Sequence, residues 1–146
     1  AYAVALDSED NAFLVGHTPG NMDGNTPAGE KDLILLKFDS SGAWQWTKQH
    51  GTPENEDARD LAIDSQGNLF LVARTRGDMD GNINAGGRDI VLIKFDSSGN
   101  WQWTQQKGTV EFDDAWAVAL DSQGNIFLAG TTEGDMDGNI NAGSGT

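Results

Sequence analysis

Two nearly identical loops carry the side chains of this sequence that are best suited to chemistry. The segment GDMDGNINAG begins at Gly77 and occurs again from Gly134. Each copy alternates oxygen-bearing side chains around a glycine that lets the backbone turn, and Ca²⁺ takes about six to eight such oxygens. The predicted ligands are Asp78, Asp80, Asn82, Asn84 and Asp89 for one calcium site, and Asp135, Asp137, Asn139 and Asn141 for the other.

The calcium motif is only partly formed, and a second interpretation stays open. The aspartates and asparagines match the first, third and fifth positions of an EF-hand loop, but Gly81 is fourth instead of sixth and Asp89 is shorter than the usual Glu. A related loop earlier in the chain keeps Asp23 and Asn25, with Asp32 as a further candidate ligand. Asp-Gly-Asn also builds tight turns without any metal. The loops are therefore either calcium sites or plain turns.

Catalytic constellations are missing from the sequence. The chain has no Cys and two His, His17 and His50, which have no counterpart in the other repeats. It contains neither a phosphate-binding loop nor a nucleophile elbow. The sequence therefore predicts a protein that is not an enzyme.

The charge and the hydropathy exclude two classes of partner. The 146 residues include 23 Asp and Glu against nine Lys and Arg, a formal charge of −14. A nucleic-acid backbone would be repelled by this charge. Apolar runs stay far below the roughly 18 residues of a membrane-spanning helix. We therefore expect no nucleic-acid partner and no membrane insertion.

A period of 57 residues organises the chain. AYAVALDSEDN at residue 1 returns as ARDLAIDSQGN at residue 58 and as AWAVALDSQGN at residue 115, so that Asp7, Asp64 and Asp121 are 57 residues apart. In the second copy, runs of β-forming residues predict four strands. They are Asp60–Ile63, Asn68–Arg74, Asp89–Phe95 and Trp101–Lys107. Asp-Ser-x-Gly-Asn segments between them predict hairpin turns with glycine in the left-handed region.

Four antiparallel strands in about 50 residues, without a helix, are typical of a β-propeller blade. The fold class predicted is all-β, with four-stranded antiparallel meanders as blades and about two and a half blades in this chain. Blade 1 is expected at residues 1–51, blade 2 at residues 52–108, and the first half of blade 3 at residues 109–146.

The repeat resembles a known family. A-x-A-[VL]-D-S-x-G-N-[IL]-F-L followed by K-F-D-S-S-G-N-W is similar to the bacterial β-propeller repeat called SBBP and, more distantly, to NHL repeats. This resemblance implies a propeller architecture and an extracellular or cell-surface setting, and it implies no particular activity.

Aromatic and variable positions add candidate ligand contacts. Tyr2, Arg59 and Trp116 occupy one equivalent position at the start of the first strand of each repeat. Variation at a fixed position is what a ligand-facing rim shows, although a plain exposed site gives the same pattern. Trp pairs at 44/46 and 101/103 either stack on carbohydrate or pack between blades.

The favoured function is a non-enzymatic extracellular or cell-surface propeller segment for binding, adhesion or surface structure, stabilised by calcium. The alternatives are the propeller part of a larger enzyme whose catalytic residues lie elsewhere, and an architectural array that assembles with itself. Expected partners are neighbouring blades, copies of the same chain, and a carbohydrate or protein ligand, because open strand edges and apolar faces attract partners.

Overall fold

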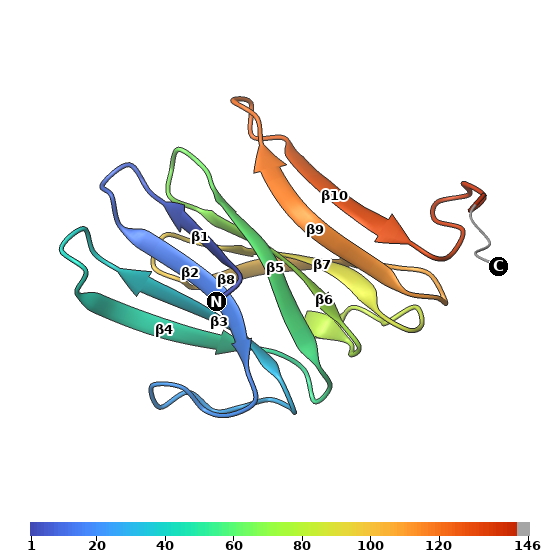
Figure 1. Cartoon of the computed structure of the whole chain (residues 1–146), viewed down its shortest axis with the longest axis horizontal. Coiled ribbons are helices and arrows are strands. Elements are labelled where there is room, and N and C mark those ends of the chain that lie inside the picture. Colours follow the sequence, from blue (N-terminus) through green and yellow to red (C-terminus); the bar gives the residue numbers. More distant parts are fainter. Residues whose placement is uncertain (143–146) are drawn as a thin grey trace.

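Short β-strands joined by tight turns form the computed structural model, which describes residues 1–142 (Figure 1). The last residues of the predicted third blade, 143–146, lie outside the described part. The elements are β1 (Ala3–Leu6), β2 (Ala12–Thr18), β3 (Asp32–Phe38), β4 (Trp44–His50), β5 (Glu56–Ile63), β6 (Leu69–Thr75), η1 (Met79–Gly81), β7 (Asp89–Phe95), β8 (Trp101–Lys107), β9 (Asp113–Leu120) and β10 (Ile126–Thr132). The prediction of an all-β chain is confirmed.

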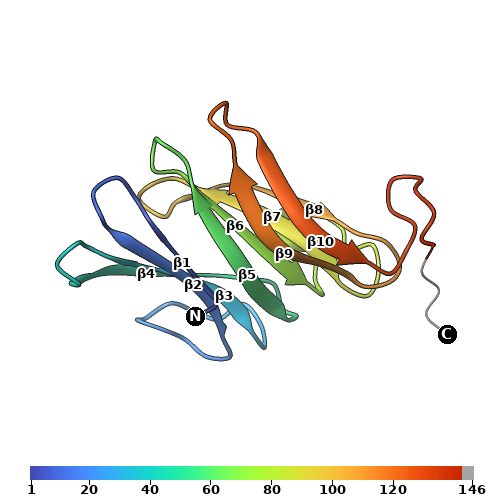
Figure 2. The ribbon, with the colours of Figure 1, turned by 45° about the horizontal axis from the view of Figure 1, so that its top comes forward.

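The strands form three antiparallel sheets in which chain order is spatial order. The first sheet is β1-β2-β3-β4, the second is β5-β6-β7-β8, and the third is the pair β9-β10. Each strand pairs with the next one along the chain, as in the register Ile63↔Leu69 between β5 and β6. This is the predicted meander. The three sheets form an open row and not a closed ring (Figures 1 and 2).

The predicted hairpin turns are present. Gly67 has a φ of 81°, and its N–H donates to the carbonyl oxygen of Asp64 at 3.0 Å. The Asp64 carboxylate accepts from the backbone N–H groups of Gln66 and Asn68. Asp10 takes the left-handed position of the first copy with a φ of 61°, which Asp tolerates better than most residues.

The sheets stack face to face, and the stacking creates two apolar layers. Between the first and second sheets lie side chains such as Phe13, Leu35 and Leu71. Between the second and third sheets lie Phe70 and Val118 with their neighbours. Strand β7 is covered on both faces over most of its length. Its four consecutive apolar residues, Ile-Val-Leu-Ile, therefore do not have to alternate with polar side chains.

The first strand of the second sheet begins earlier than predicted. β5 starts at Glu56 instead of Asp60. The N–H of Glu56 donates to the carbonyl oxygen of Lys31 at 2.8 Å, so the start of β5 is aligned by a residue of the preceding repeat. Local sequence could not reveal this contact. The stacking also brings β1, β5 and β9 next to one another (Figure 2).

None of the residues 1–142 belongs to a helix that is long and apolar enough to cross a membrane. The one helical element in that described range, η1, has three residues.

Candidate functional site

The loop between β6 and β7 is held in place by its backbone and by one buried side chain. Met79 is fully buried, and its N–H donates to Oε1 of Gln106 at 3.0 Å. Asp80 and Gly81 follow with φ values of 51° and 83°. Asn82 closes the turn by donating its backbone N–H and its side-chain amide to the carbonyl oxygen of Met79.

The carboxylates of this loop face different donors. Oδ1 of Asp78 accepts from the N–H of Asn84 at 2.8 Å. Oδ2 of Asp80 accepts from the hydroxyl of Thr104 and lies 2.9 Å from Nε2 of His50. Oδ2 of Asp89 accepts from the N–H of Ala85 and from the side-chain amide of Gln106. The loop is thus ordered by its own hydrogen bonds.

The other two copies follow the same plan with different partners. Asp135 accepts from the N–H of Asn141 at 2.7 Å, as Asp78 does from Asn84. Asp137 pairs with Lys107, and Asp23 accepts from the hydroxyl of Thr47 at 2.5 Å. The side-chain amides of Asn139 and Asn25 donate to the carbonyl oxygens of Met136 and Met22.

Within residues 1–142, no three Asp, Glu or His side chains converge in a way that could hold a metal ion. Asp78 and Asp80 each use one carboxylate oxygen in the hydrogen bonds above, which leaves the other oxygen for a cation. A calcium ion would need main-chain and amide oxygens besides these. Calcium binding therefore stays a prediction.

Both histidines contact carboxylates, and neither prepares a nucleophile. His50 and the Thr104 hydroxyl meet the same oxygen of Asp80, so the hydroxyl faces an acceptor carboxylate and not the imidazole that would act as its base. His17 lies between Tyr2, whose hydroxyl is 3.4 Å from Nε2, and Asp57, 3.5 Å from Nδ1. Partial burial lowers the pKa of His17, and although Asp57 opposes this, the nearby Lys31 and Arg59 charges act in the same direction as burial.

The two tryptophans of each pair have different surroundings. Trp46 packs against the layer between the first and second sheets, and Trp103 against the layer between the second and third. Trp44 and Trp101 are exposed, and each donates its indole N–H to a threonine hydroxyl three residues later. One member of each pair thus packs between the sheets and the other faces solvent.

The equivalent residues Tyr2, Arg59 and Trp116 do lie along one edge of the row of sheets, as β1, β5 and β9 are neighbours. The guanidinium of Arg59 lies over the Trp116 ring, 4.6 Å from its centroid. The ring of Tyr2 is 4.8 Å from that of His17. The stacking of the sheets thereby joins residues that are 57 positions apart in the chain into one surface.

An ion network at this edge escaped the sequence analysis. Asp57 accepts from Lys31 at 2.7 Å and from Arg74 at 2.9 Å. Arg74 also donates to Asp114 at 2.8 Å, and Arg88 lies 3.4 Å from the same carboxylate. The period was the signal in the sequence that could have revealed this network. Asp57 and Asp114 are one repeat apart, and so are Lys31 and Arg88.

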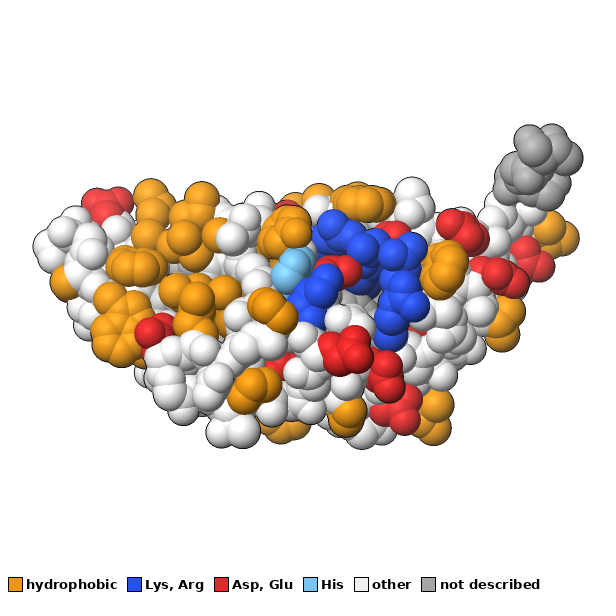
Figure 3. All heavy atoms as spheres, turned by 60° about the horizontal axis from the view of Figure 1, so that its bottom comes forward, with side chains coloured by type: hydrophobic (Ala, Val, Ile, Leu, Met, Phe, Trp, Pro, Cys, Tyr) orange, Lys and Arg blue, Asp and Glu red, His pale blue; other side chains and the backbone are white. Residues whose placement is uncertain are grey.

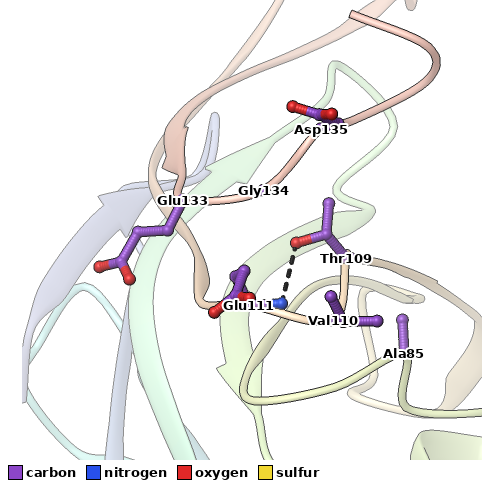
Figure 4. Close-up of a pocket in the computed structure, with 8 residues that line it drawn as sticks. Ala85, Thr109, Val110, Glu111, Glu133, Gly134 and Asp135 are labelled. Atoms are coloured by element: carbon purple, nitrogen blue, oxygen red, sulfur yellow. Dashed lines mark hydrogen bonds between the residues drawn. The ribbon is translucent and has the colours of Figure 1, made fainter. Parts of the chain in front are cut away.

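A shallow pocket of about 600 Å³ lies between the segment that follows β8 and the segment that follows β10 (Figure 4). Thr109, Val110 and Gly134 line it, and the Thr109 hydroxyl accepts from the N–H of Glu111 at 3.2 Å. Its carboxylates come from separate turns, and the side chains of Glu133 and Asp135 diverge in the view (Figure 4). The pocket therefore brings no reactive groups together.

A comparison with protein families finds a match for part of the repeat. Residues 45–78 match the family model described as SBBP, beta-propeller repeat. This segment is therefore similar to an SBBP repeat. This confirms the resemblance inferred from the motif, and the match runs from β4 of the first sheet through β5 and β6 of the second.

One curated relative of this chain is the regulatory protein FlaEY of Caulobacter vibrioides, which is 27% identical over 147 aligned positions. The alignment covers 91% of this chain and 15% of the relative, so the chain spans only a small part of that protein's length.

Proposed function

We propose that this chain is a non-enzymatic β-propeller module that acts as a binding and structural scaffold at the cell surface. We further propose that its two outer sheet faces bind a second copy of the same chain. The observation that carries the proposal is the exposure of one equivalent phenylalanine in the three sheets. Phe13 is 1% exposed, Phe70 is 6% exposed and Phe127 is 58% exposed.

The difference follows from what covers each residue. Phe13 and Phe70 lie on the face that packs against the next sheet along the row, in the layers between sheets one and two and between sheets two and three. Phe127 has the same place on the third sheet, where no further sheet follows among residues 1–142. A large apolar side chain buried twice and exposed once indicates an interface that is built to be covered.

The opposite end of the row supports the same conclusion. Leu61 and Val118 are 5% and 8% exposed because a preceding sheet covers them, whereas the equivalent Val4 is 63% exposed. The left end of Figure 3, over the first sheet, is largely apolar. Sheets meet twice within the chain, and the two outer faces carry apolar residues at the same repeat positions as the faces that meet there.

A second copy can continue the row because the outer face of the first sheet and that of the third are unlike and complementary. Such a contact is head-to-tail, so each copy uses a different face and assembly proceeds in one direction. The strong negative charge of the chain keeps it soluble during this assembly, because repulsion between copies opposes unspecific aggregation.

The experiment is sedimentation of two charge variants, alone and mixed. The wild-type chain is expected to form oligomers that grow with concentration, and Val4→Glu and Phe127→Glu should each reduce this to monomers. A 1:1 mixture of the two variants keeps one intact pair of faces and should form dimers only. Ile83→Glu, at an exposed loop residue, is the matched control and should oligomerise as the wild type does.

A wild-type monomer at all micromolar concentrations would refute self-assembly, and so would unchanged oligomers of both variants. The surface location is tested separately, by protease and antibody access on intact cells of the source. The FlaEY relative is named a regulatory protein, and a non-enzymatic binding role is of the same general kind.

A further inference from the structure

The positive side chains of this acidic protein are not spread evenly. Four of the nine Lys and Arg residues gather where β5 and β6 meet the residues just before β3 and β7, and they are Lys31, Arg59, Arg74 and Arg88. Figure 3 shows Lys and Arg side chains grouped beside a histidine near the middle of the molecule. We call these four residues the cationic cluster.

The internal ion pairs leave part of this charge uncompensated. Lys31, Arg74 and Arg88 share the two carboxylates of Asp57 and Asp114. Arg59 makes no ion pair or hydrogen bond with any described residue, and its Nε is buried without a partner. Nε of Arg88 is likewise buried and without a partner. Three cations share two carboxylates and Arg59 has none, so the cluster carries an excess of positive charge that an external anion would balance.

Aromatic rings hold both arginines in place. Arg59 lies over Trp116, and Arg88 lies over Phe112 at 4.5 Å from the ring centroid. A guanidinium held flat on a ring loses little freedom when it binds a carboxylate with two parallel hydrogen bonds. The arginines are thus arranged for recognition before any ligand arrives.

Exposed aromatic side chains lie on the segments that neighbour β5, the strand of Arg59. Trp116 is 51% exposed and Tyr2 is 57% exposed. Trp116 is on β9 and Tyr2 precedes β1, and both of these strands contact β5. Flat apolar surfaces of this size contact the faces of sugar rings well, because both surfaces are amphipathic.

We infer that the cationic cluster, with the Tyr2 and Trp116 rings, is a binding site for an acidic oligosaccharide that carries carboxylate groups. Arg59 and Arg88 bind carboxylates, and the rings stack on the sugars. The ligand is short, because the charge of −14 over the whole chain repels a long polyanion that reaches beyond the cluster. Of the two residues chosen to test self-assembly, Phe127 lies on β10, away from this site, whereas Val4 lines a shallow pocket together with Tyr2.

The test is calorimetric titration with trigalacturonic acid as the probe and neutral galactotriose as its uncharged counterpart. We expect the acidic sugar to bind and the neutral sugar to bind at least about tenfold more weakly. Arg59→Ala should weaken binding of the acidic sugar by about tenfold or more, and Arg59→Lys by less, since the charge remains but the paired hydrogen bonds are lost.

Lys94→Ala is the matched control. Its ammonium also lies over an aromatic ring, 5.4 Å from the centroid of Phe70, but outside the cluster. This variant should bind as the wild type does, and melting curves should show that all variants are folded.

Three results would overturn the inference. They are no heat of binding with the acidic sugar, equal binding by wild type and the folded Arg59→Ala variant, and equal or tighter binding of a hexaglutamate peptide, which would make the site a receptor for acidic peptides. Because Phe127 lies on β10 and contributes nothing to the cationic cluster, Phe127→Glu should lose self-assembly and keep sugar binding, so failure of either proposal is recognised separately.

Discussion

Asp57 joins the first and second sheets, and replacing it with Asn tests how much the ion network contributes to stability. Its carboxylate accepts from Lys31, at the start of the first sheet's β3, and from Arg74 in β6. Partial burial alone would raise the pKa of Asp57, but the hydrogen bonds and charges of Lys31 and Arg74 outweigh it and lower the pKa from 3.8 to about 2.

The size of the effect follows from this pKa. A fall from 3.8 to about 2 corresponds to roughly 2 kcal/mol of stability, at about 1.4 kcal/mol per pH unit. The side chains of Lys31 and Arg74 are 33% and 19% exposed, so solvent screening reduces the contribution to about 1–2 kcal/mol. We expect Asp57→Asn to lose about this much free energy of unfolding at neutral pH.

The pH dependence gives the prediction its sharpest form. Because the pKa is lower in the folded state than in the unfolded state, the stabilisation is complete above pH 4 to 5. It is lost as the pH falls through the range from about 4 to about 2. Urea unfolding followed by tryptophan fluorescence should therefore show a clear difference between wild type and variant at about pH 7 and a small one at about pH 2.5.

The control is Asp10→Asn, which removes one carboxylate at an exposed turn where Asn also accepts the left-handed backbone. Its difference from wild type should be small at both pH values. An Asp57→Asn difference that is the same at both pH values would refute the electrostatic explanation and leave only a packing effect.

Two further predictions concern the layers and the loops. In a denaturant titration of a dilute solution, Phe70→Ala should lower the free energy of unfolding by about 3–5 kcal/mol, and Phe127→Ala should lower it by less than about 1 kcal/mol. The reason is that only the Phe70 ring is buried between sheets. Equal losses would contradict the stacking described above. Millimolar Ca²⁺ should raise the melting temperature above that in chelator, by the equivalent of about 2.7 kcal/mol per site at about 100 times the dissociation constant, and Asp80→Ala should reduce the rise by removing one of the two sites. Identical melting of the wild type in both buffers would mean that the loops are only turns.

The repeat and its local structure could be predicted because their causes lie close together in the chain. Alternating β-forming residues set the strands, and Asp64 with Gly67 sets a turn whose hydrogen bonds span only four residues. The exact 57-residue period then assigned every copy the same four-strand plan, which the first two sheets and the β9-β10 pair follow. Where a strand depended on a distant partner, as β5 does on Lys31, its start was placed too late.

The sequence named part of the candidate binding site without showing its extent. Tyr2, Arg59 and Trp116 stood out because they differ at one fixed position of the repeat. Their neighbours Lys31, Arg74 and Arg88 are ordinary charged residues in the sequence, and each lies on a different segment. Only the stacking of the sheets makes them neighbours, because it sets β1, β5 and β9 side by side.

The amino-acid sequence by itself determined the strand class and the turns, which follow from residues within one repeat, and the period and the resemblance to SBBP repeats, which follow from the order of residues along the chain. The tertiary structure alone decided which apolar face is covered, which carboxylate pairs with which cation, and that Arg59 rests on Trp116 without an acceptor. These features join residues from different repeats. Their energies depend on distance and burial in space, which periodicity along the chain does not specify.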